Sequence, residues 1–359
     1  MALIAAISDL HLTNSLPYTV VGDSFRKAYL MKYLDFFFKE IDDAHVDYLV
    51  VPGDVCHNSL LDPDDLSLLE YFLYLVKRSD LDTMIISGNH DMDGEKSILS
   101  FLVNSNYNLK NIQFENTYQW KYVSYDIVFH CINFCNNSVF LDCAERAVVD
   151  AKNYSDRQNI LIGHVGVKGS LHGTTKSILG VNQEDIDRLA ETFDFIFLGH
   201  HHKFQWINER CIYVGAPQQT RIDEINCIPG GVIIDTQQSG KIFFIENRFS
   251  PRFSILDTET FRSSEVKGKI VKPVFEDRLS TEEMKTNWLK EIIGCEPYYL
   301  IKPRLREKFE NSETTGFSST DKRKALFKTM KSFNEKKKRP KSFYKHALKL
   351  YEEEVNKGG

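Results

Sequence analysis

The stretch Leu198-Gly199-His200-His201-His202-Lys203 directly follows an apolar run, Phe193 to Leu198, that is typical of a buried strand. A Gly-His-x-His sequence at the end of a strand can deliver two imidazoles, those of His200 and His202, to one point in space. His201 lies between them and points the other way, so we expect it to be structural. The stretch therefore predicts a binding site at the end of this strand, to which other segments must contribute.

A rhythm of apolar strand, polar loop and helix runs through the first 95 residues. We expect strands at Leu3 to Ile7, Tyr48 to Val51 and Met84 to Ile86, and helices from Phe25 to about Asp43 and from about Pro63. The helices carry apolar residues at helical spacing, and proline suits a first helical turn. This rhythm is typical of the α/β fold class with a layered sheet.

The middle of the chain has a more antiparallel character. We expect there a strand from Tyr122 to Cys131, a helix around Cys143 to Lys152, a strand at Ile160 to Ile162, a long loop from Gly166 to Asn182, a helix from about Gln183 to Thr192, and strands at Ile212 to Val214, Gly230 to Asp235 and Lys241 to Glu246. Turn residues separate the last three strands. The sheet structure is therefore expected to extend to about residue 250.

Five of the expected strands end in residue types that bind divalent metal ions. In chain order these residues are Asp9 and His11, Asp54, Asn89, His164, and His200 with His202. Each stretch alone is more often an ordinary turn, but together they all end apolar strands. Ligands gather at the carboxyl ends of strands in open α/β sheets. The seven residues are therefore predicted to form one metal centre.

The donor types limit which metal ions the centre can hold. A mixture of carboxylate, imidazole and amide donors suits Mn²⁺, Fe²⁺ or Zn²⁺ better than Mg²⁺ alone, which prefers oxygen ligands. A structural zinc site would instead use thiolates. Seven ligands are too many for one ion, so we expect two divalent metal ions that share a bridging carboxylate.

Composition places the chain among globular proteins with one large domain. Of its 359 residues, 42% are hydrophobic, which is enough for a sizeable core. No apolar run approaches the ~20 residues of a membrane span. The first residues read as a strand and not as a signal peptide. The seven cysteines are sparse, so we expect reduced thiols and a cytoplasmic location.

Charge is distributed unevenly along the chain. Residues 1–320 contain 32 Lys/Arg against 45 Asp/Glu, whereas residues 321–349 contain 12 against 2. An acidic body with a basic tail implies that the two parts meet different partners or each other. The basic tail has three interpretations: docking onto a partner, direct contact with phosphates, or a solvated tail. We favour docking, because two amphipathic helices are expected within 322–356 and their apolar stripes have no obvious place in the body.

Composition also predicts the domain boundaries. The first domain spans 1–252. A small α+β unit over 253–308 is expected to contain a strand from Lys267 to Phe275, a helix from Thr281 to Ile293 and a strand from Tyr298 to Leu305. A Ser/Thr/Gly-rich linker at 309–321 then leads to the two-helix tail at 322–356.

The order Asp-x-His, Gly-Asp, Gly-Asn-His-Asp, Gly-His and Gly-His-x-His resembles the calcineurin-like metallophosphoesterase superfamily over residues 1 to about 250. Within it the chain is similar to the SbcD-type DNA-repair nucleases. Three features carry this closer resemblance: His57 three residues after Asp54, the spacing of 193–203 and 213–217, and the continuation into a small unit and a helical tail. Three departures are Cys56 in place of an aromatic residue, Ala216 in place of Ser or Thr, and the shortness of the 253–308 unit.

The resemblance implies a layered α/β/β/α sandwich with a small α+β cap unit and a C-terminal helical tail. It also implies that Asp9, His11, Asp54 and His202 hold one metal ion, and that Asp54, Asn89, His164 and His200 hold the other. Asp54 is then the bridge, and Mn²⁺ is the expected ion. His90 is expected to protonate the leaving oxygen, Asp91 to orient His90 through a hydrogen bond, and His57 to position the substrate phosphate.

The resemblance implies the nuclease subunit of an SbcC-SbcD-like DNA repair complex. Such subunits act as exonucleases on double-stranded DNA and as endonucleases on single-stranded DNA. The implied partners are DNA, an SMC-like ABC ATPase bound by the C-terminal helices, and a second copy of the chain in a homodimer. The implied location is the bacterial cytoplasm, or the host cytoplasm if the chain is phage-encoded.

Two alternatives remain open on sequence grounds. The first is another phosphoesterase with this core, either a protein phosphatase or a small-nucleotide phosphodiesterase. Protein phosphatases of the superfamily carry Asp-Arg-Gly after the Gly-Asp stretch, and residues 57–59 are His-Asn-Ser. A small-nucleotide phosphodiesterase would not need the basic tail. The second alternative is a non-catalytic scaffold, which the full set of ligand residues disfavours.

Overall fold

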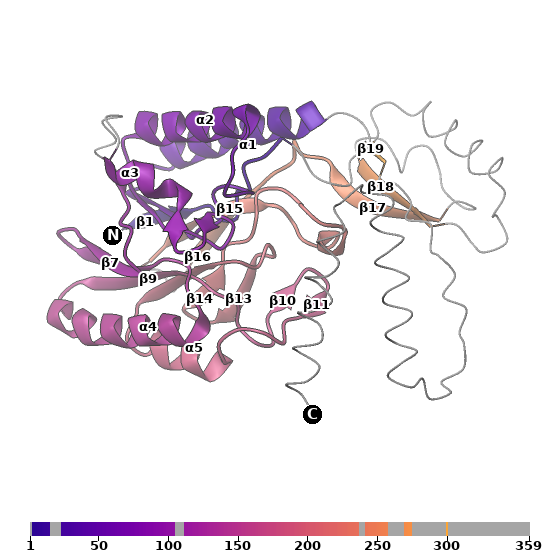
Figure 1. Ribbon diagram of the computed structural model, residues 1–359. Coiled ribbons are helices and arrows are strands. Elements are labelled where there is room, and N and C mark those ends of the chain that lie inside the picture. Colours follow the sequence, from indigo (N-terminus) through magenta and orange to yellow (C-terminus); the bar gives the residue numbers. More distant parts are fainter. Residues whose placement is uncertain are drawn as a thin grey trace, which may run out of the picture. The chain divides into compact units, whose positions relative to one another are not determined.

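Two six-stranded sheets pack face to face, and two pairs of helices cover their outer faces (Figure 1). The computed structural model describes residues 2–14, 23–104, 111–236, 241–257, 269–274 and 299–300. The strand order is β16-β15-β1-β2-β3-β6 in the first sheet and β13-β14-β12-β9-β8-β7 in the second. The expected α/β fold class is confirmed, as a layered α/β/β/α sandwich.

The first sheet combines parallel and antiparallel strands. Its strands are β1 Leu3–Ala6, β2 Tyr48–Val51, β3 Asp82–Ile85, β6 Ile112–Gln113, β15 Gly230–Asp235 and β16 Lys241–Glu246. The first four are parallel, and β15 and β16 run antiparallel to their neighbours. Helices α1 Asp23–Asp43 and α2 Pro63–Ser79 make the crossovers that parallel pairing requires. Both were predicted, with α1 beginning two residues earlier than expected.

The second sheet corrects the expectation of an antiparallel middle. Its strands are β7 Gln119–Val123, β8 Ile127–Ile132, β9 Gln158–His164, β12 Phe195–Gly199, β13 Gln205–Asn208 and β14 Cys211–Tyr213. Strands β8, β9, β12 and β14 are parallel, and only the edge strands β7 and β13 are antiparallel. The reason is that α4 Asn137–Ala151 and α5 Gln183–Ala190 carry the chain back after β8 and β9.

The single strand expected from Tyr122 to Cys131 is wrong, because this segment forms a hairpin of β7 and β8. The backbone N–H of Ser124 donates to the carbonyl oxygen of Ile127 at 2.9 Å and closes the turn. Tyr125 at its tip is 95% exposed. The alternation of apolar residues continues through this turn, which contains no glycine or proline.

Capping side chains set the starts of two helices. The Asp62 carboxylate accepts from the backbone N–H groups of Asp64 and Asp65 at 2.8 and 2.9 Å, and Pro63 occupies the first turn of α2. Asn136 accepts from Val139 N–H at 3.0 Å. Helix α4 therefore begins at Asn137, six residues before the expected start.

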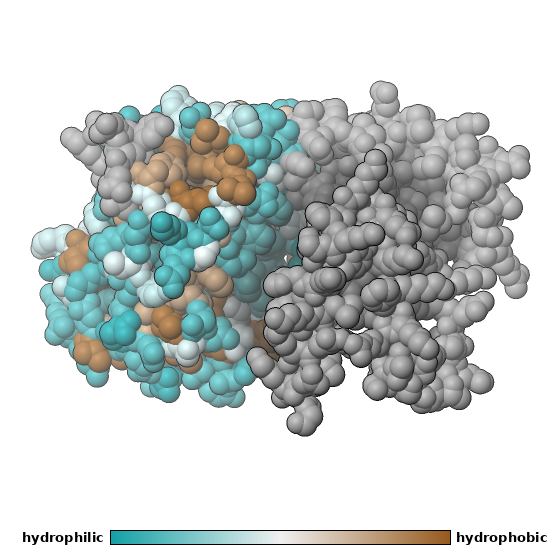
Figure 2. Space-filling model, in the orientation of Figure 1, coloured by the Kyte–Doolittle hydropathy of each residue, from teal (hydrophilic) through white to brown (hydrophobic). Residues whose placement is uncertain are grey.

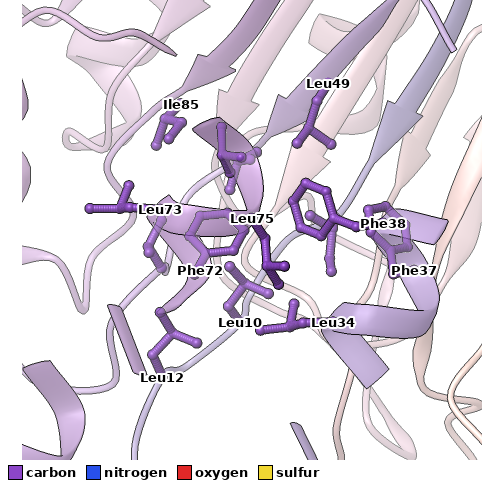
Figure 3. Packing of buried hydrophobic residues seen from close by; sticks show 14 of the residues in the cluster. Leu10, Leu12, Leu34, Phe37, Phe38, Leu49, Phe72, Leu73, Leu75 and Ile85 are labelled. Atoms are coloured by element: carbon purple, nitrogen blue, oxygen red, sulfur yellow. The ribbon is translucent and has the colours of Figure 1, made fainter. Parts of the chain in front are cut away.

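Apolar side chains fill three layers. The middle layer joins the facing sides of the sheets, for example Ile4 of β1 and Ile162 of β9. Figure 3 shows part of the layer under α1 and α2, where the rings of Phe38 and Phe72 meet edge to face at 6.3 Å. The third layer lies under α4 and α5. On the face shown in Figure 2, most of the coloured residues are hydrophilic, with one larger hydrophobic patch near the top and smaller ones below.

Short elements lie between the main strands. They are β4 Met92–Asp93, β5 Lys96–Ser97, η1 Ile98–Ser100, α3 Phe101–Asn104, η2 Lys152–Tyr154, β10 Leu171–His172, β11 Thr175–Lys176 and η3 Ile222–Glu224. Strands β10 and β11 pair as a hairpin inside the long loop expected at 166–182. No helix among the described residues is long and apolar enough to cross a membrane.

A third sheet contains β17 Arg252–Asp257, β18 Lys269–Val274 and β19 Tyr299–Leu300, all parallel. Strand β18 corresponds to the strand expected from Lys267, and β19 to the start of the one expected from Tyr298. Phe253 and Ile270 pack with Ile222. The predicted helix at 281–293, the linker at 309–321 and the helices at 322–356 lie outside the described residues.

Candidate metal centre

The carboxyl ends of β1, β2, β3, β9 and β12 bring all seven predicted ligands together. The first three strands are parallel neighbours in one sheet, and the last two are parallel neighbours in the other. Two groups of ligand atoms lie within 4.8 Å of one another: those of Asp9, His11 and His202, and those of Asp9, Asp54 and His164. The two sheets thus each supply part of a single buried cluster.

The first group centres on His11 and His202. Their Nε2 atoms lie 2.9 Å apart, and Nε2 of His202 is 3.9 Å from Oδ1 of Asp9. The Nδ1–H of His202 donates to the carboxylate of Glu224 at 2.7 Å. This bond orients the ring so that Nε2 of His202 faces the cluster.

Asn89 links His164 of the second group to His200. Its Oδ1 lies 3.2 Å from Nε2 of His164 and 3.0 Å from Nδ1 of His200. The Nδ1–H of His164 donates to the carbonyl oxygen of Pro52 at 2.8 Å, which turns Nε2 inward. Oδ2 of Asp54 is 3.4 Å from Nε2 of His164 and 3.7 Å from Nε2 of His11. Asp54 therefore stands between the two groups, where a bridging ligand belongs.

Left-handed backbone conformations aim several of these side chains. Asp9, His11, Asp54 and His200 have φ angles of 49°, 42°, 50° and 99°, and they are four of the six described non-glycine residues with positive φ. Such conformations are costly and concentrate at functional sites. Hydrogen bonds hold them: the N–H of His200 donates to Asp9 at 3.0 Å, and the N–H of His90 donates to Asp54 at 2.8 Å.

Three glycines allow the ligand loops to approach one another. A methyl group on Gly88 would lie 2.1 Å from Oδ1 of Asp54, and one on Gly199 would lie 2.0 Å from the carbonyl oxygen of Pro52. On Gly53, whose φ is +88°, it would lie 2.5 Å from Nδ1 of His164. No other residue type fits these positions without moving a ligand.

The surroundings lower the pKa of the predicted ligand His200 and raise the pKa of two other predicted histidine ligands. Burial lowers the pKa of His200 to about 3. Burial acts to raise the pKa of Asp54, but the charge of His164 holds it below its ordinary value. For His164 and His202 burial lowers the pKa, while the carboxylates of Asp54 and Glu224 raise it, to about 9 in each case. At pH 7 the carboxylate of Asp54 is thus ionised and His200 neutral, and binding an ion at His164 or His202 releases a proton.

These donors fit divalent metal ions. Asp9, Asp54, His11, His164 and His202 are buried, and they converge from both sheets. Carboxylate, imidazole and amide donors suit transition-metal ions. This His/Asp cluster can therefore hold divalent metal ions.

His90 and His57 flank the cluster on the side of His11. Their rings stack with centroids 5.3 Å apart, and His90 meets His11 edge-on at 4.6 Å. The Nδ1–H of His90 donates to the carbonyl oxygen of His57 at 2.6 Å, which leaves Nε2 of His90 for other contacts. Burial lowers the pKa of His57 to about 4, so His57 is neutral at pH 7.

Asp91 differs from the expectation that it hydrogen-bonds His90. Its carboxylate instead accepts from the backbone N–H groups of Val55, Cys56 and Gly88, at 3.1, 2.8 and 2.8 Å. Asp91 is fully buried. It therefore ties the loop that carries Asp54 to the loop that carries Asn89 and acts on the site through their backbones.

Asp91→Asn is expected to destabilise the protein by about 2–4 kcal/mol, because one amide oxygen cannot accept from three N–H groups and the new NH₂ group faces donors. Urea unfolding followed by circular dichroism measures this. The exposed Asp93→Asn serves as the matched control and should change stability by less than about 0.5 kcal/mol. Equal stabilities for the two variants would contradict the role given to Asp91.

Glu224 is a functional residue that the sequence interpretation missed. Besides His202, its carboxylate binds the backbone N–H of Thr220 at 2.6 Å and the Thr220 hydroxyl at 3.0 Å. It is 2% exposed. No spacing rule links position 224 to the histidines. The available signal was its place shortly after the 213–217 stretch.

His201 binds Ser170 and stacks on Tyr213, as expected for a structural residue.

Glu224→Gln is expected to weaken metal binding about 10–100-fold, the usual effect of losing a carboxylate behind a histidine ligand. Titration of metal-free protein with Mn²⁺ by calorimetry measures the affinity directly. Glu209→Gln, in the exposed turn between β13 and β14, is the control. Unchanged Mn²⁺ affinity in Glu224→Gln would show that Glu224 does not support His202 as a metal ligand.

Comparison with known proteins agrees with this geometry. The family model of calcineurin-like phosphoesterases matches residues 2–204. The DNA double-strand break repair protein Mre11 of Methanopyrus kandleri is 21% identical over 342 residues, covering 87% of this chain and 73% of that protein. Its namesake from Nanoarchaeum equitans is 23% identical over 253 residues, covering 65% and 66%. A crystal structure of a dimetal phosphatase from Danio rerio matches at 9% identity with a TM-score of 0.46, over 68% of this chain and 99% of that one.

Proposed function

Because the chain belongs to the calcineurin-like phosphoesterase family and is a metal-dependent hydrolase, we propose that it is a DNA nuclease that cleaves phosphodiester bonds. The observation that carries hydrolysis is the convergence of seven ligands from five strands on one cluster. The similarity to DNA double-strand break repair proteins over 87% of the chain supports DNA as the substrate.

Two Mn²⁺ ions are the proposed cofactors, with Mg²⁺, Fe²⁺ or Zn²⁺ as alternatives. Asp9, His11, Asp54 and His202 would hold one, and Asp54, Asn89, His164 and His200 the other. Such an ion pair lowers the pKa of a water molecule toward neutrality and offsets charge on the phosphoryl oxygens. The mixed nitrogen and oxygen donors are the reason for preferring Mn²⁺ to Mg²⁺.

The flanking histidines would complete the reaction. Nε2 of His90 is the proton donor for the leaving oxygen, because its Nδ1 is held by the carbonyl of His57. The neutral ring of His57 lies beside His90 and would position the substrate phosphate through a hydrogen bond. Asp91 would hold both ligand loops in register, as its three backbone contacts allow.

The proposed partners rest on the family resemblance and on the charge distribution. Residues 1–320 carry 45 acids against 32 bases, which is unfavourable for tight binding to DNA alone. The basic tail at 322–356 would dock onto an SMC-like ABC ATPase of the SbcC type, and the 253–308 unit would act as a small cap on DNA. The 309–321 linker would connect the two, and the chain would act as a homodimer in the cytoplasm.

The test of the function is digestion of end-labelled duplex and single-stranded DNA with Mn²⁺, beside a small phosphodiester such as bis-p-nitrophenyl phosphate. We expect Mn²⁺-dependent cleavage of both DNAs, exonucleolytic on the duplex and endonucleolytic on single strands. A matched reaction with EDTA should be inactive. Hydrolysis of the small ester without cleavage of DNA would favour a small-nucleotide phosphodiesterase instead.

A further inference from the structure

The loop from Gly166 to Asn182 carries two adjacent aliphatic side chains that are almost fully exposed. Ile178 is 84% exposed and Leu179 is 76% exposed. Isolated apolar residues are common on protein surfaces. Here two consecutive residues are exposed to this extent. They lie on the loop that follows β9, the strand that ends at the predicted ligand His164.

The exposure does not result from a loose loop. The N–H of Val181 donates to the carbonyl oxygen of Gly166, and the N–H of Lys168 donates to that of Val181, both at 2.9 Å. The N–H of Gly169 donates to Ser177 at 2.8 Å, and the Ser177 hydroxyl donates to the carbonyl oxygen of Leu179 at 2.8 Å. The segment that presents the pair is therefore fixed at both ends.

The pair lies beside the metal centre. A methyl group placed on Gly166 would lie 3.4 Å from the carbonyl oxygen of Leu179 and 3.4 Å from Cδ2 of His200. The backbone of Leu179 and the ring of His200, a predicted ligand, thus both lie next to Gly166. The backbone that carries the pair therefore lies close to one side of the predicted centre.

The charge of the loop sets it apart from the rest of the acidic body. Residues 166–182 contain Lys168, His172 and Lys176 and no Asp or Glu. Both lysines are exposed. Cationic side chains next to apolar ones match a nucleic-acid strand, which offers phosphates along its backbone and apolar base faces beside them.

We propose that Ile178 and Leu179 contact the nucleobases next to the cleaved phosphodiester, while Lys168 and Lys176 face the backbone phosphates on either side. This proposal rests on the proposed nuclease function and assigns contact with the polynucleotide to the 166–182 loop. Aliphatic side chains that press against a base step weaken its stacking. The loop therefore favours an extended strand with bases over a small phosphate ester.

The test compares the double variant Ile178→Ala/Leu179→Ala with wild type on an oligonucleotide and on bis-p-nitrophenyl phosphate. The ratio of kcat/KM for DNA to that for the ester should fall roughly tenfold, the equivalent of about 1.4 kcal/mol of lost apolar contact. The matched control is Leu66→Ala/Val149→Ala, which removes two exposed aliphatic side chains from α2 and α4. Its ratio should stay at the wild-type value.

A second readout follows the bases themselves. An oligonucleotide with 2-aminopurine next to the cleaved bond, mixed with protein in EDTA, should fluoresce more on binding as the base unstacks. The double variant should lose this increase. Wild-type ratios and fluorescence in the double variant would overturn the inference while leaving the nuclease function intact. Wild-type protein that hydrolyses the ester and not DNA would overturn both.

Discussion

Asp54→Asn should leave the chain folded but unable to retain its metal ions. Oδ2 of Asp54 lies within 3.7 Å of Nε2 of both His11 and His164, one from each ligand group. A neutral amide at position 54 removes an anionic oxygen that lies near histidines of both groups. Activity on DNA and on a small phosphodiester should fall by more than the ~100-fold that loss of a group behind a ligand can cost.

Metal content after dialysis against Mn²⁺, measured by inductively coupled plasma mass spectrometry, checks this prediction. We expect two ions per wild-type chain and fewer than one per Asp54→Asn chain. The control is Asp223→Asn, a carboxylate that binds Arg221 and not the cluster. Two retained ions in Asp54→Asn would show that another residue bridges them, and Asp9, which belongs to both ligand groups, would be the candidate.

His90→Ala should have the opposite profile, with normal metal content and little activity. The side chain of His90 adjoins the cluster through His11 and donates its Nδ1–H to His57, but its backbone N–H supports Asp54. That backbone bond survives the substitution, so the ligands should keep their places. Loss of a general acid typically lowers the rate by about 10²–10⁴-fold.

Steady-state cleavage of DNA measures the loss, and added imidazole provides the control. Imidazole should partly restore His90→Ala, because it can enter the space left by the ring, and should not restore Asp54→Asn. A substrate with a good leaving group, such as a p-nitrophenyl ester, should show a smaller loss than DNA. An undiminished rate on DNA in His90→Ala would end its assignment as the proton donor.

Much of the fold followed from local patterns, and the errors have identifiable causes. The strand ends that carry ligands were predicted, because buried parallel strands form short continuous apolar runs. The β7–β8 hairpin was missed because Tyr125 continues the apolar alternation through the turn although it is exposed. The start of α4 was missed because Asn137 and Ser138 at its beginning are polar, although Phe140, Cys143 and Ala144 have helical spacing.

The sequence predicts the ligands of the candidate site but not the residues that support those ligands. The predicted ligands can be identified from residue order, since each lies at or shortly after the end of a strand. The hydrogen-bond partners of Asp91 cannot be identified in this way, because they are backbone N–H groups, which every residue except proline has. Glu224 reaches His202 only through the folding of the 215–224 segment under the cluster, and no periodicity encodes that path.

Gly53, Gly88 and Gly199 carry no reactive group, yet the crowding around them has a consequence for variation in this protein. In a library of all single substitutions they should be as intolerant as the metal ligands, since even alanine would place a carbon within 2.5 Å of ligand atoms or of Pro52. Substitution of any of these glycines should reduce activity as strongly as substitution of a predicted ligand. Substitutions that add a side chain near the centre should therefore be tolerated mainly at exposed positions, where they do not move the interior.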